Sequence, residues 1–250
     1  MIKMKKKKIE LSIIIPAYNE EDCIEKTILD VFKVFRDAKI NFELILVDDG
    51  STDNTLRACK ALQKKLSFSV IHLNKNQGYS KALKTGFLKA MGEYITYMDA
   101  DLQHPPDQIL KLYRAAVDQA YDFVTGCCNK KNYRGKIYPY FRRLASKSYN
   151  LIVRILFKTK TGDAHAKKVF KRKLIHARKI YALYGLMDLE LLLIGLRESP
   201  DIKAIPLKVN PRFAGKSKLT PWLMLRTLIN VFRLKWFIRK ENKIENAKKA

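Results

Sequence analysis

Three short acidic segments are the part of this chain best suited to chemistry. They span residues 16–20, 48–51 and 99–103, and each directly follows a short apolar run. Taken singly, each also suits an ordinary turn or helix start. Together, carboxylates that converge at one edge of a sheet repel one another unless a cation or ligand lies between them. The Asp99-Ala100-Asp101 turn presents oxygens suited to Mg²⁺ or Mn²⁺. The pattern therefore predicts a site for a metal-bridged diphosphate, which is a stabilised leaving group.

The elements that must position these segments follow from periodicity. Runs rich in Ile, Val and Phe are typical of buried strands, and they span 11–16, 42–47, 68–73, 94–98 and 123–125. Stretches of helical length and period separate them, at 21–35, 54–65, 80–91 and 106–120. This alternation predicts an α/β protein with a mostly parallel, doubly wound sheet. Ligands bind at the carboxyl ends of strands in such sheets, so the acidic segments are expected together.

The second half of the chain is less regular. A basic loop is expected over 128–139, followed by a helix at 140–157, a strand at 168–170 and helices at 173–181 and 188–197. A strand at 202–209 and a final helix at 221–239 complete the pattern. The expected organisation is a basic tail over 1–10, one α/β domain over 11–218, and a basic C-terminal helix and tail over 219–250.

The composition of the chain indicates which partners and which cellular compartment suit the protein. Its 250 residues carry a formal net charge of +26, which attracts polyanions such as nucleic acid, an anionic membrane or phosphorylated substrates. No Cys-x-x-Cys pair and no secretory signal are visible, which favours a reduced, cytoplasmic-facing protein. The most apolar stretch, 219–237, is interrupted by Arg226, Arg233 and Lys235, so no membrane span is expected. The final helix mixes aromatic and basic residues, and packing on the protein and lying in a membrane interface are equally open.

The run "MDADLQHPP", from Met98 to Pro106, makes the sequence resemble glycosyltransferase family 2. Within that family it is most similar to the branch of dolichyl- and polyprenyl-phosphate mannosyl- and glucosyltransferases, over roughly residues 11–218. The resemblance implies the GT-A fold and a Mg²⁺ or Mn²⁺ cofactor. It also implies inverting transfer of a sugar from a GDP-mannose or UDP-glucose type donor. The acceptor would be a polyprenyl or dolichyl phosphate, reached by peripheral association with the cytoplasmic face of a membrane.

The same resemblance assigns roles to individual residues. Asp101 and Gln103 would hold the metal, and Asp99 would face the sugar and ribose of the donor. Arg142 and Ser146, in "FRRLASKSYN", would bind the acceptor phosphate, because arginine binds phosphate oxygens in a fork. The nucleotide sugar would be bound by Pro16, Tyr18, Glu20, Val47, Asp49, Asp99, Ala100, Arg212 and Lys218.

Two departures from the branch raise alternatives. Cys128 stands where the branch usually has a phosphate-binding arginine, and the segment Asp163 to Lys168 lacks a glycine and is one residue short. A saccharide hydroxyl acceptor therefore remains open, and it would need a base, for which Asp188 is the first candidate. A non-catalytic protein that binds nucleotide sugars or polyanions is a further alternative. Nucleic acid is not an expected partner, because no recognised nucleic-acid motif is present.

Overall fold

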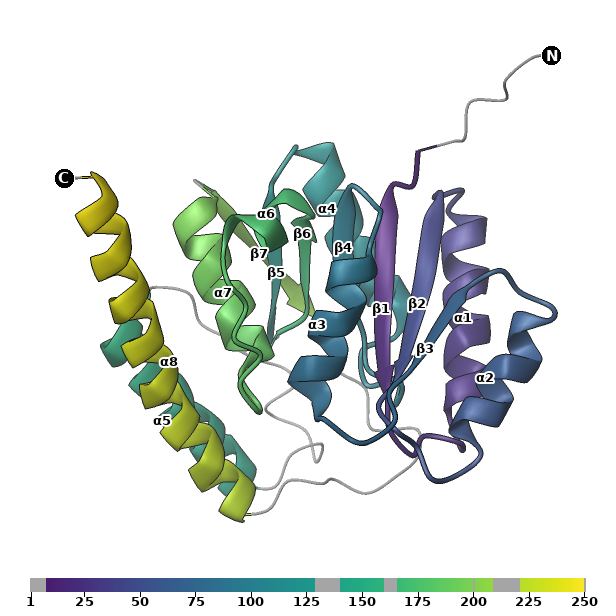
Figure 1. The fold of residues 1–250 in the computed structure, drawn as a ribbon. Coiled ribbons are helices and arrows are strands. Elements are labelled where there is room, and N and C mark those ends of the chain that lie inside the picture. Colours follow the sequence, from purple (N-terminus) through teal and green to yellow (C-terminus); the bar gives the residue numbers. More distant parts are fainter. Residues whose placement is uncertain (1–7, 129–139, 160–165, 200, 209–220, 250) are drawn as a thin grey trace.

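A seven-stranded sheet forms the centre of the protein (Figure 1). The computed structural model describes residues 8–128, 140–159, 166–199, 201–208 and 221–249. The strand order is β3-β2-β1-β4-β6-β5-β7, and every strand is parallel to the others except β6, which is antiparallel to both of its neighbours. The strands are β1 (Leu11–Ala17), β2 (Phe42–Asp48), β3 (Ser69–His72), β4 (Tyr94–Tyr97), β5 (Phe123–Cys128), β6 (Lys168–Lys171) and β7 (Ile202–Leu207).

Helices cover both faces of the sheet. One face packs against α1 (Ile24–Asp37), α2 (Thr55–Gln63) and α4 (Pro106–Asp118). The other packs against α3 (Tyr79–Lys89), α6 (Lys173–Ala177) and α7 (Met187–Glu198). Two further helices, α5 (Tyr140–Phe157) and α8 (Pro221–Lys249), lie side by side as an outer layer at the left of Figure 1. The expected doubly wound α/β arrangement is confirmed.

Alternation along the central strands divides the core in two. In β1, Leu11, Ile13 and Ile15 belong to the hydrophobic cluster beneath α1 and α4, whereas Ile14 belongs to the cluster beneath α3. Successive side chains of a strand point to opposite faces, so a strand covered by helices on both faces must be apolar throughout. This requirement explains why β1 is buried at every position.

Most element boundaries shift by one to three residues from the sequence expectation, as in α1, which begins at Ile24 and not at residue 21, and the ends of three elements have a clear physical reason. Strand β5 continues to Cys128, because its last residues pair with β7. Helix α6 ends at Ala177 and not at residue 181, because the backbone N–H groups of Tyr181, Ala182 and Leu183 bind the Glu190 carboxylate instead of continuing a helix. Helix α8 continues to Lys249, through a segment rich in the good helix formers Lys, Glu and Ala.

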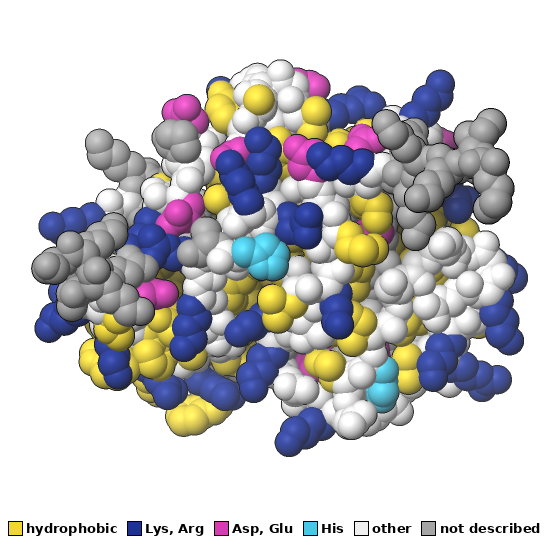
Figure 2. All heavy atoms as spheres, turned by 45° about the horizontal axis from the view of Figure 1, so that its top comes forward, with side chains coloured by type: hydrophobic (Ala, Val, Ile, Leu, Met, Phe, Trp, Pro, Cys, Tyr) yellow, Lys and Arg dark blue, Asp and Glu magenta, His cyan; other side chains and the backbone are white. Residues whose placement is uncertain are grey.

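Helix α8 has apolar residues on opposite faces. Val231 and Leu234 are buried against the protein, and the Asn230 amide donates to the Tyr184 carbonyl. Trp222, Leu225, Ile229, Phe232 and Trp236 are exposed, and their spacing of three and four residues places them along one outer stripe. In Figure 2 hydrophobic side chains gather at the lower left, on the side of α5 and α8, with basic side chains between them. The inner face of this helix therefore suits packing on the protein, and its outer stripe suits a membrane interface.

Basic residues are not confined to one region. Figure 2 shows Lys and Arg side chains spread over the whole visible face, so the net charge of +26 does not mark a single binding patch there. Over the part of the chain that the structure describes, no helix combines the length and apolar character needed to cross a membrane.

Candidate active site

The segments that follow β1 and β2 are joined by hydrogen bonds at the lower edge of the sheet in Figure 1. Asn19, at a positive φ of 54°, receives the Thr52 N–H at 2.8 Å on its side-chain oxygen. The Glu20 N–H donates to the Thr55 hydroxyl at 2.8 Å. These bonds convert two separate loops into one preformed wall, next to Pro16 and Tyr18.

The second acidic segment serves mainly to hold that wall. Asp48 is fully buried, with His72 Nδ1 2.6 Å from its carboxylate. Asp49 is also buried, and its two oxygens accept the backbone N–H groups of Gln77 and Gly78, each at 2.8 Å. Gly50 has a φ of +71°, and a Cβ there would lie 2.7 Å from the Lys75 carbonyl carbon, so only glycine fits this turn. The Asp49 carboxylate therefore anchors the loop over 75–78.

Val47 and Pro16 occupy matching positions on neighbouring strands. The Val47 side chain is buried in the cluster beneath α3, and Pro16 is buried beside it. These two buried side chains therefore support the sheet edge from within the protein. Tyr18 and Glu20, which follow β1, are partly exposed, so they are the accessible ones among the residues expected to bind the nucleotide on β1, β2 and the segments after them.

The Asp99-Ala100-Asp101 turn follows β4 at the same edge. The Ala100 carbonyl accepts the Thr27 hydroxyl at 2.6 Å, which fixes the turn to α1. Asp101 is buried, and its Oδ1 accepts the Gln103 N–H at 3.0 Å across Leu102, which has a φ of 55°. The expected metal residues Asp101 and Gln103 therefore belong to one compact turn.

Asp99 is paired with a lysine that the sequence analysis did not assign to the site. Lys167 Nζ lies 2.8 Å from each Asp99 oxygen, and the Tyr79 hydroxyl donates to Asp99 Oδ1 at 3.0 Å. The Asp99 side chain is 30% exposed, whereas that of Lys167 is 4% exposed. Burial opposes ionisation of Asp99, but the Lys167 ammonium outweighs it and holds the pKa of Asp99 below its ordinary value. Asp99 is thus an ionised carboxylate with access to solvent.

Asp188 completes this group from the first turn of α7. It accepts a hydrogen bond from the Tyr97 hydroxyl, and the Lys167 ammonium lies 4.9 Å from the centre of the Tyr97 ring. Burial, and then the neighbouring carboxylates, raise the pKa values of Tyr79 and Tyr97 well above 10, so both remain donors. Glu190, two residues after Asp188, instead binds the backbone of 181–183. Asp188 therefore belongs to the group around Asp99 and Lys167, whereas Glu190 holds the 181–183 loop.

The remaining predicted residues are described only in part. Arg142 and Ser146 lie in the first two turns of α5, as expected, although their side chains lie outside the described residues. Arg212 and Lys218 lie outside the described residues altogether. Residue Lys167 was missed because burial next to carboxylates is not visible in a sequence. The sequence signal for it is the shortened segment before β6.

A metal ion at the Asp101 turn would share its ligands between the protein and a bound diphosphate. Among the described residues, no cluster of three or more His, Cys, Asp or Glu side chains is arranged to hold an ion. Mg²⁺, however, commonly takes one or two carboxylates and completes its shell with substrate phosphates and water. The Asp101 turn, at the edge where parallel strands end, fits that kind of site, in which most of the ligands arrive with a diphosphate. The cavity of about 550 Å³ between α7 and α8 lies apart from it and shares none of the residues Asp99, Asp101, Lys167 and Asp188.

Comparison with known proteins agrees with this arrangement. The model of the family "Glycosyl transferase family 2" matches residues 12–178. A dolichol-phosphate mannosyltransferase of Pyrococcus furiosus is 29% identical over 232 residues, which are 91% of this chain and 64% of that protein. An undecaprenyl-phosphate 4-deoxy-4-formamido-L-arabinose transferase of Proteus mirabilis is 33% identical over 67% of this chain and 51% of that protein. This chain thus spans between 51% and 64% of the length of these two relatives.

The fold also matches solved structures. Glucosyl-3-phosphoglycerate synthase of Mycobacterium tuberculosis superimposes with a TM-score of 0.66 at 20% identity, over 90% of this chain and 80% of that one. This likeness confirms the expected GT-A fold.

Proposed function

The chain belongs to glycosyl transferase family 2, and we propose that it moves a sugar, with inversion, from a nucleotide-sugar donor of the GDP-mannose or UDP-glucose type to a polyprenyl or dolichyl phosphate. The observation that carries the proposal is the group formed by Asp99, Asp101 and Asp188 where the first strands end. Asp99 and Asp101 lie in one turn beside the preformed wall of Asn19, Glu20 and Thr52. In a doubly wound sheet this edge is where a nucleotide binds.

On the donor side, Tyr18 and Glu20 contact the nucleotide, and Asp99 accepts from sugar or ribose hydroxyls. Asp101 and Gln103 would hold Mg²⁺ or Mn²⁺ together with the oxygens of the diphosphate. When bound, the cation neutralises charge on the leaving diphosphate. Solved complexes in which the mycobacterial synthase holds UDP together with Mn²⁺ or Mg²⁺ support this assignment. Arg212 and Lys218 add positive charge to the same phosphates.

On the acceptor side, Arg142 and Ser146 bind the lipid phosphate. The relatives from Pyrococcus furiosus and Proteus mirabilis are both named as lipid-phosphate transferases, which supports this acceptor class. An ionised phosphate oxygen attacks the anomeric carbon, the bond from that carbon to the donor phosphate breaks, and the nucleoside diphosphate leaves. Since the attacking oxygen is already deprotonated at neutral pH, no base is required.

The outer stripe of α8 lies on the cytoplasmic face of a membrane. Trp222 is 70% exposed and Trp236 is 58% exposed, and the neighbouring α5 adds Ile155, which is 68% exposed. The exposed residues Arg226 and Arg233 lie between Trp222 and Trp236 along α8, and the exposed Arg239 follows them. Aromatic side chains enter the interface while arginine and lysine contact anionic headgroups, so this combination favours peripheral association.

The experiment that tests the donor assignment is a panel of GDP- and UDP-sugars with Mn²⁺ or Mg²⁺, scored by thermal shift of the full chain. One nucleotide class is expected to raise the melting temperature in a metal-dependent way, because a ligand that binds only the folded state stabilises it. A chain that responds to none of these donors, yet binds DNA in a salt-sensitive way, would contradict the proposal.

A further inference from the structure

Lys167 is a buried cation at the centre of the acidic site. Its ammonium contacts both oxygens of Asp99 at 2.8 Å and the Tyr79 hydroxyl at 3.2 Å. It also lies 4.9 Å from the centre of the Tyr97 ring. Burying a charge is costly unless it is paired and hydrogen-bonded. The contacts with Asp99, Tyr79 and the Tyr97 ring meet this requirement and hold the ammonium in one position.

Carboxylates from two separate elements act on this lysine. Burial lowers the pKa of Lys167, but Asp99, Asp188 and Asp101 together raise it above its ordinary value. The lysine therefore remains positively charged. The carboxylates that act on it include Asp101, the residue expected to bind the metal.

The backbone around Lys167 is fixed by the sheet. Its carbonyl accepts the Gly126 N–H at 2.7 Å, and the next residue, Lys168, receives the Thr96 hydroxyl on its carbonyl at 2.9 Å. Lys167 lies in the segment that is one residue shorter than in the branch that this chain resembles. Lys167, which directly precedes β6, thus places its ammonium against Asp99.

A fixed cation beside a divalent-metal site repels the metal and neutralises a carboxylate that would attract it. A diphosphate brings several negative charges to the same place and reverses the balance. We propose that Lys167 makes metal binding dependent on the nucleotide, so that Mn²⁺ or Mg²⁺ binds together with the donor and only weakly alone. This inference rests on the proposed function, since it concerns the metal of the donor site.

The test measures the dissociation constant of Mn²⁺ by electron paramagnetic resonance, for the full chain alone and with saturating GDP or UDP. Wild type is expected to bind Mn²⁺ weakly alone and at least about tenfold more tightly with the nucleotide. Lys167→Met is expected to tighten binding of Mn²⁺ alone at least about tenfold, because it removes one unit charge from the site. Lys167→Arg, which keeps the charge, should behave as wild type does.

A matched control is Lys171→Met, which removes an ion-paired lysine at the end of β6, the strand that follows Lys167, outside the acidic site. It should leave Mn²⁺ binding unchanged. Lys167→Gln, which retains a hydrogen-bond donor for Asp99, replaces the methionine variant if that variant does not fold. Nucleotide-dependent binding that neither uncharged variant alters would overturn this inference alone. Absence of Mn²⁺ binding even with nucleotide would overturn both the inference and the metal in the proposed function.

Discussion

The two sides of the proposed site differ in how completely they are built. On the donor edge, which comprises the segments 16–21, 48–55, 75–78 and 99–103, polar groups meet partners within the protein, as in the contacts of Asp49 with Gln77 and Gly78. The outer helical layer, α5 and α8, instead exposes large apolar side chains such as Ile155 and Trp222. A contiguous exposed apolar surface marks an interaction site in soluble proteins. The donor edge is thus preformed. The outer helical layer, on the acceptor side, instead needs a partner to cover its apolar side chains, and we propose that this partner is the membrane.

The largest expected effect tests the donor edge. Asp101→Ala should lower transfer roughly a thousandfold, because stabilisation of the leaving diphosphate by a cation is worth several kcal/mol. The variant should stay folded, since it removes a carboxylate from a turn at the sheet edge. Asp107→Asn, which changes an exposed acid at the start of α4, is the control. Near-normal turnover by Asp101→Ala, or full activity in excess chelator, would remove the metal from the mechanism.

Next in size is the prediction that separates the two sides. Arg142→Ala should lower transfer to a lipid phosphate roughly ten- to a hundredfold, the effect of losing one charge-assisted phosphate contact. Donor affinity should remain unchanged, because Arg142 lies on α5 and not on the donor edge. If the acceptor is a saccharide hydroxyl, the damaging change would instead be Asp188→Asn. Retained transfer to lipid phosphate by Arg142→Ala would favour that alternative.

The third prediction distinguishes a structural role of Asp49, which is to anchor the loop over 75–78, from a role in binding the nucleotide. Asp49→Asn replaces one accepting oxygen with an amide that faces a backbone N–H, so the free energy of unfolding should fall by about 1–3 kcal/mol. Urea unfolding measures this change, and donor affinity should be compared at temperatures where the variant is folded. Unchanged stability with lost donor affinity would show that Asp49 acts mainly by contacting the nucleotide.

A fourth prediction concerns the outer helical layer. Trp236→Ser should weaken binding to anionic vesicles roughly tenfold, since an aromatic side chain contributes about 1.5–3 kcal/mol when fully buried. Leu29→Ser changes an exposed apolar residue on α1 and should have no effect on vesicle binding. Deleting the whole helix would be a poorer test, because Val231 and Leu234 on its inner face are buried in the core. Equal binding by wild type and Trp236→Ser would place the membrane contact elsewhere.

The smallest effect is expected where neither side of the site is involved. Asp122, between α4 and β5, pairs with Lys171 and Lys173. Burial opposes its ionisation, but these lysines outweigh it and lower the pKa of Asp122. Stabilisation by this pair is therefore present above the unfolded pKa, near 3.9, and lost as pH falls through the lower folded pKa. Asp122→Asn should cost about 0.2–1 kcal/mol at pH 7 and nothing near pH 2, while transfer is unchanged. A pH-independent difference in urea unfolding would contradict the ion pair.

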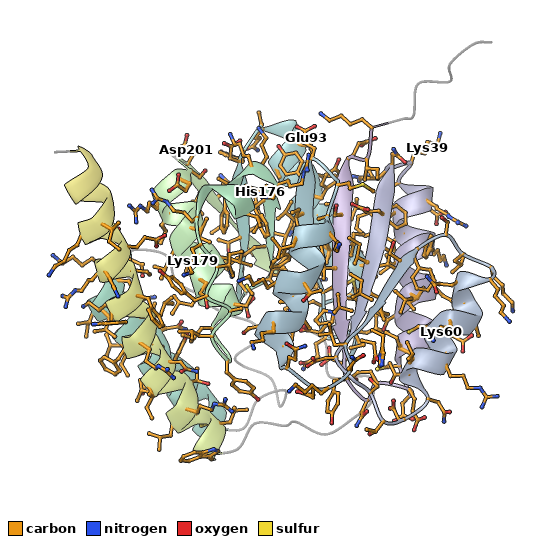
Figure 3. The ribbon with its side chains drawn as sticks, in the orientation of Figure 1. Lys39, Lys60, Glu93, His176, Lys179 and Asp201 are labelled. Carbon is orange, nitrogen blue, oxygen red and sulfur yellow. The ribbon has the colours of Figure 1, made fainter. Side chains whose placement is uncertain are left out.

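The same contrast explains what the sequence could predict. The donor edge follows from local patterns, because strand β1, the turn after it and the Asp99 turn each depend on neighbouring residues. Lys167 could not be assigned, since its position beside Asp99 depends on the antiparallel pairing of β6 with β4, across 68 residues of chain. Likewise, Asp188 and Glu190 look alike in sequence, and only the packing of the 181–183 loop separates their roles. An acidic side chain in the sequence also does not by itself indicate the site. Glu93 and Asp201 lie at the edge of the sheet opposite the site (Figure 3).

The most direct test of the account is transfer of labelled sugar from the donor selected by thermal shift to a short polyprenyl phosphate, with a saccharide acceptor in parallel. The account predicts metal-dependent formation of a lipid-phosphate-linked sugar with inverted anomeric configuration and release of one nucleoside diphosphate per sugar. Transfer to the saccharide hydroxyl alone, with no product on lipid phosphate, would contradict it.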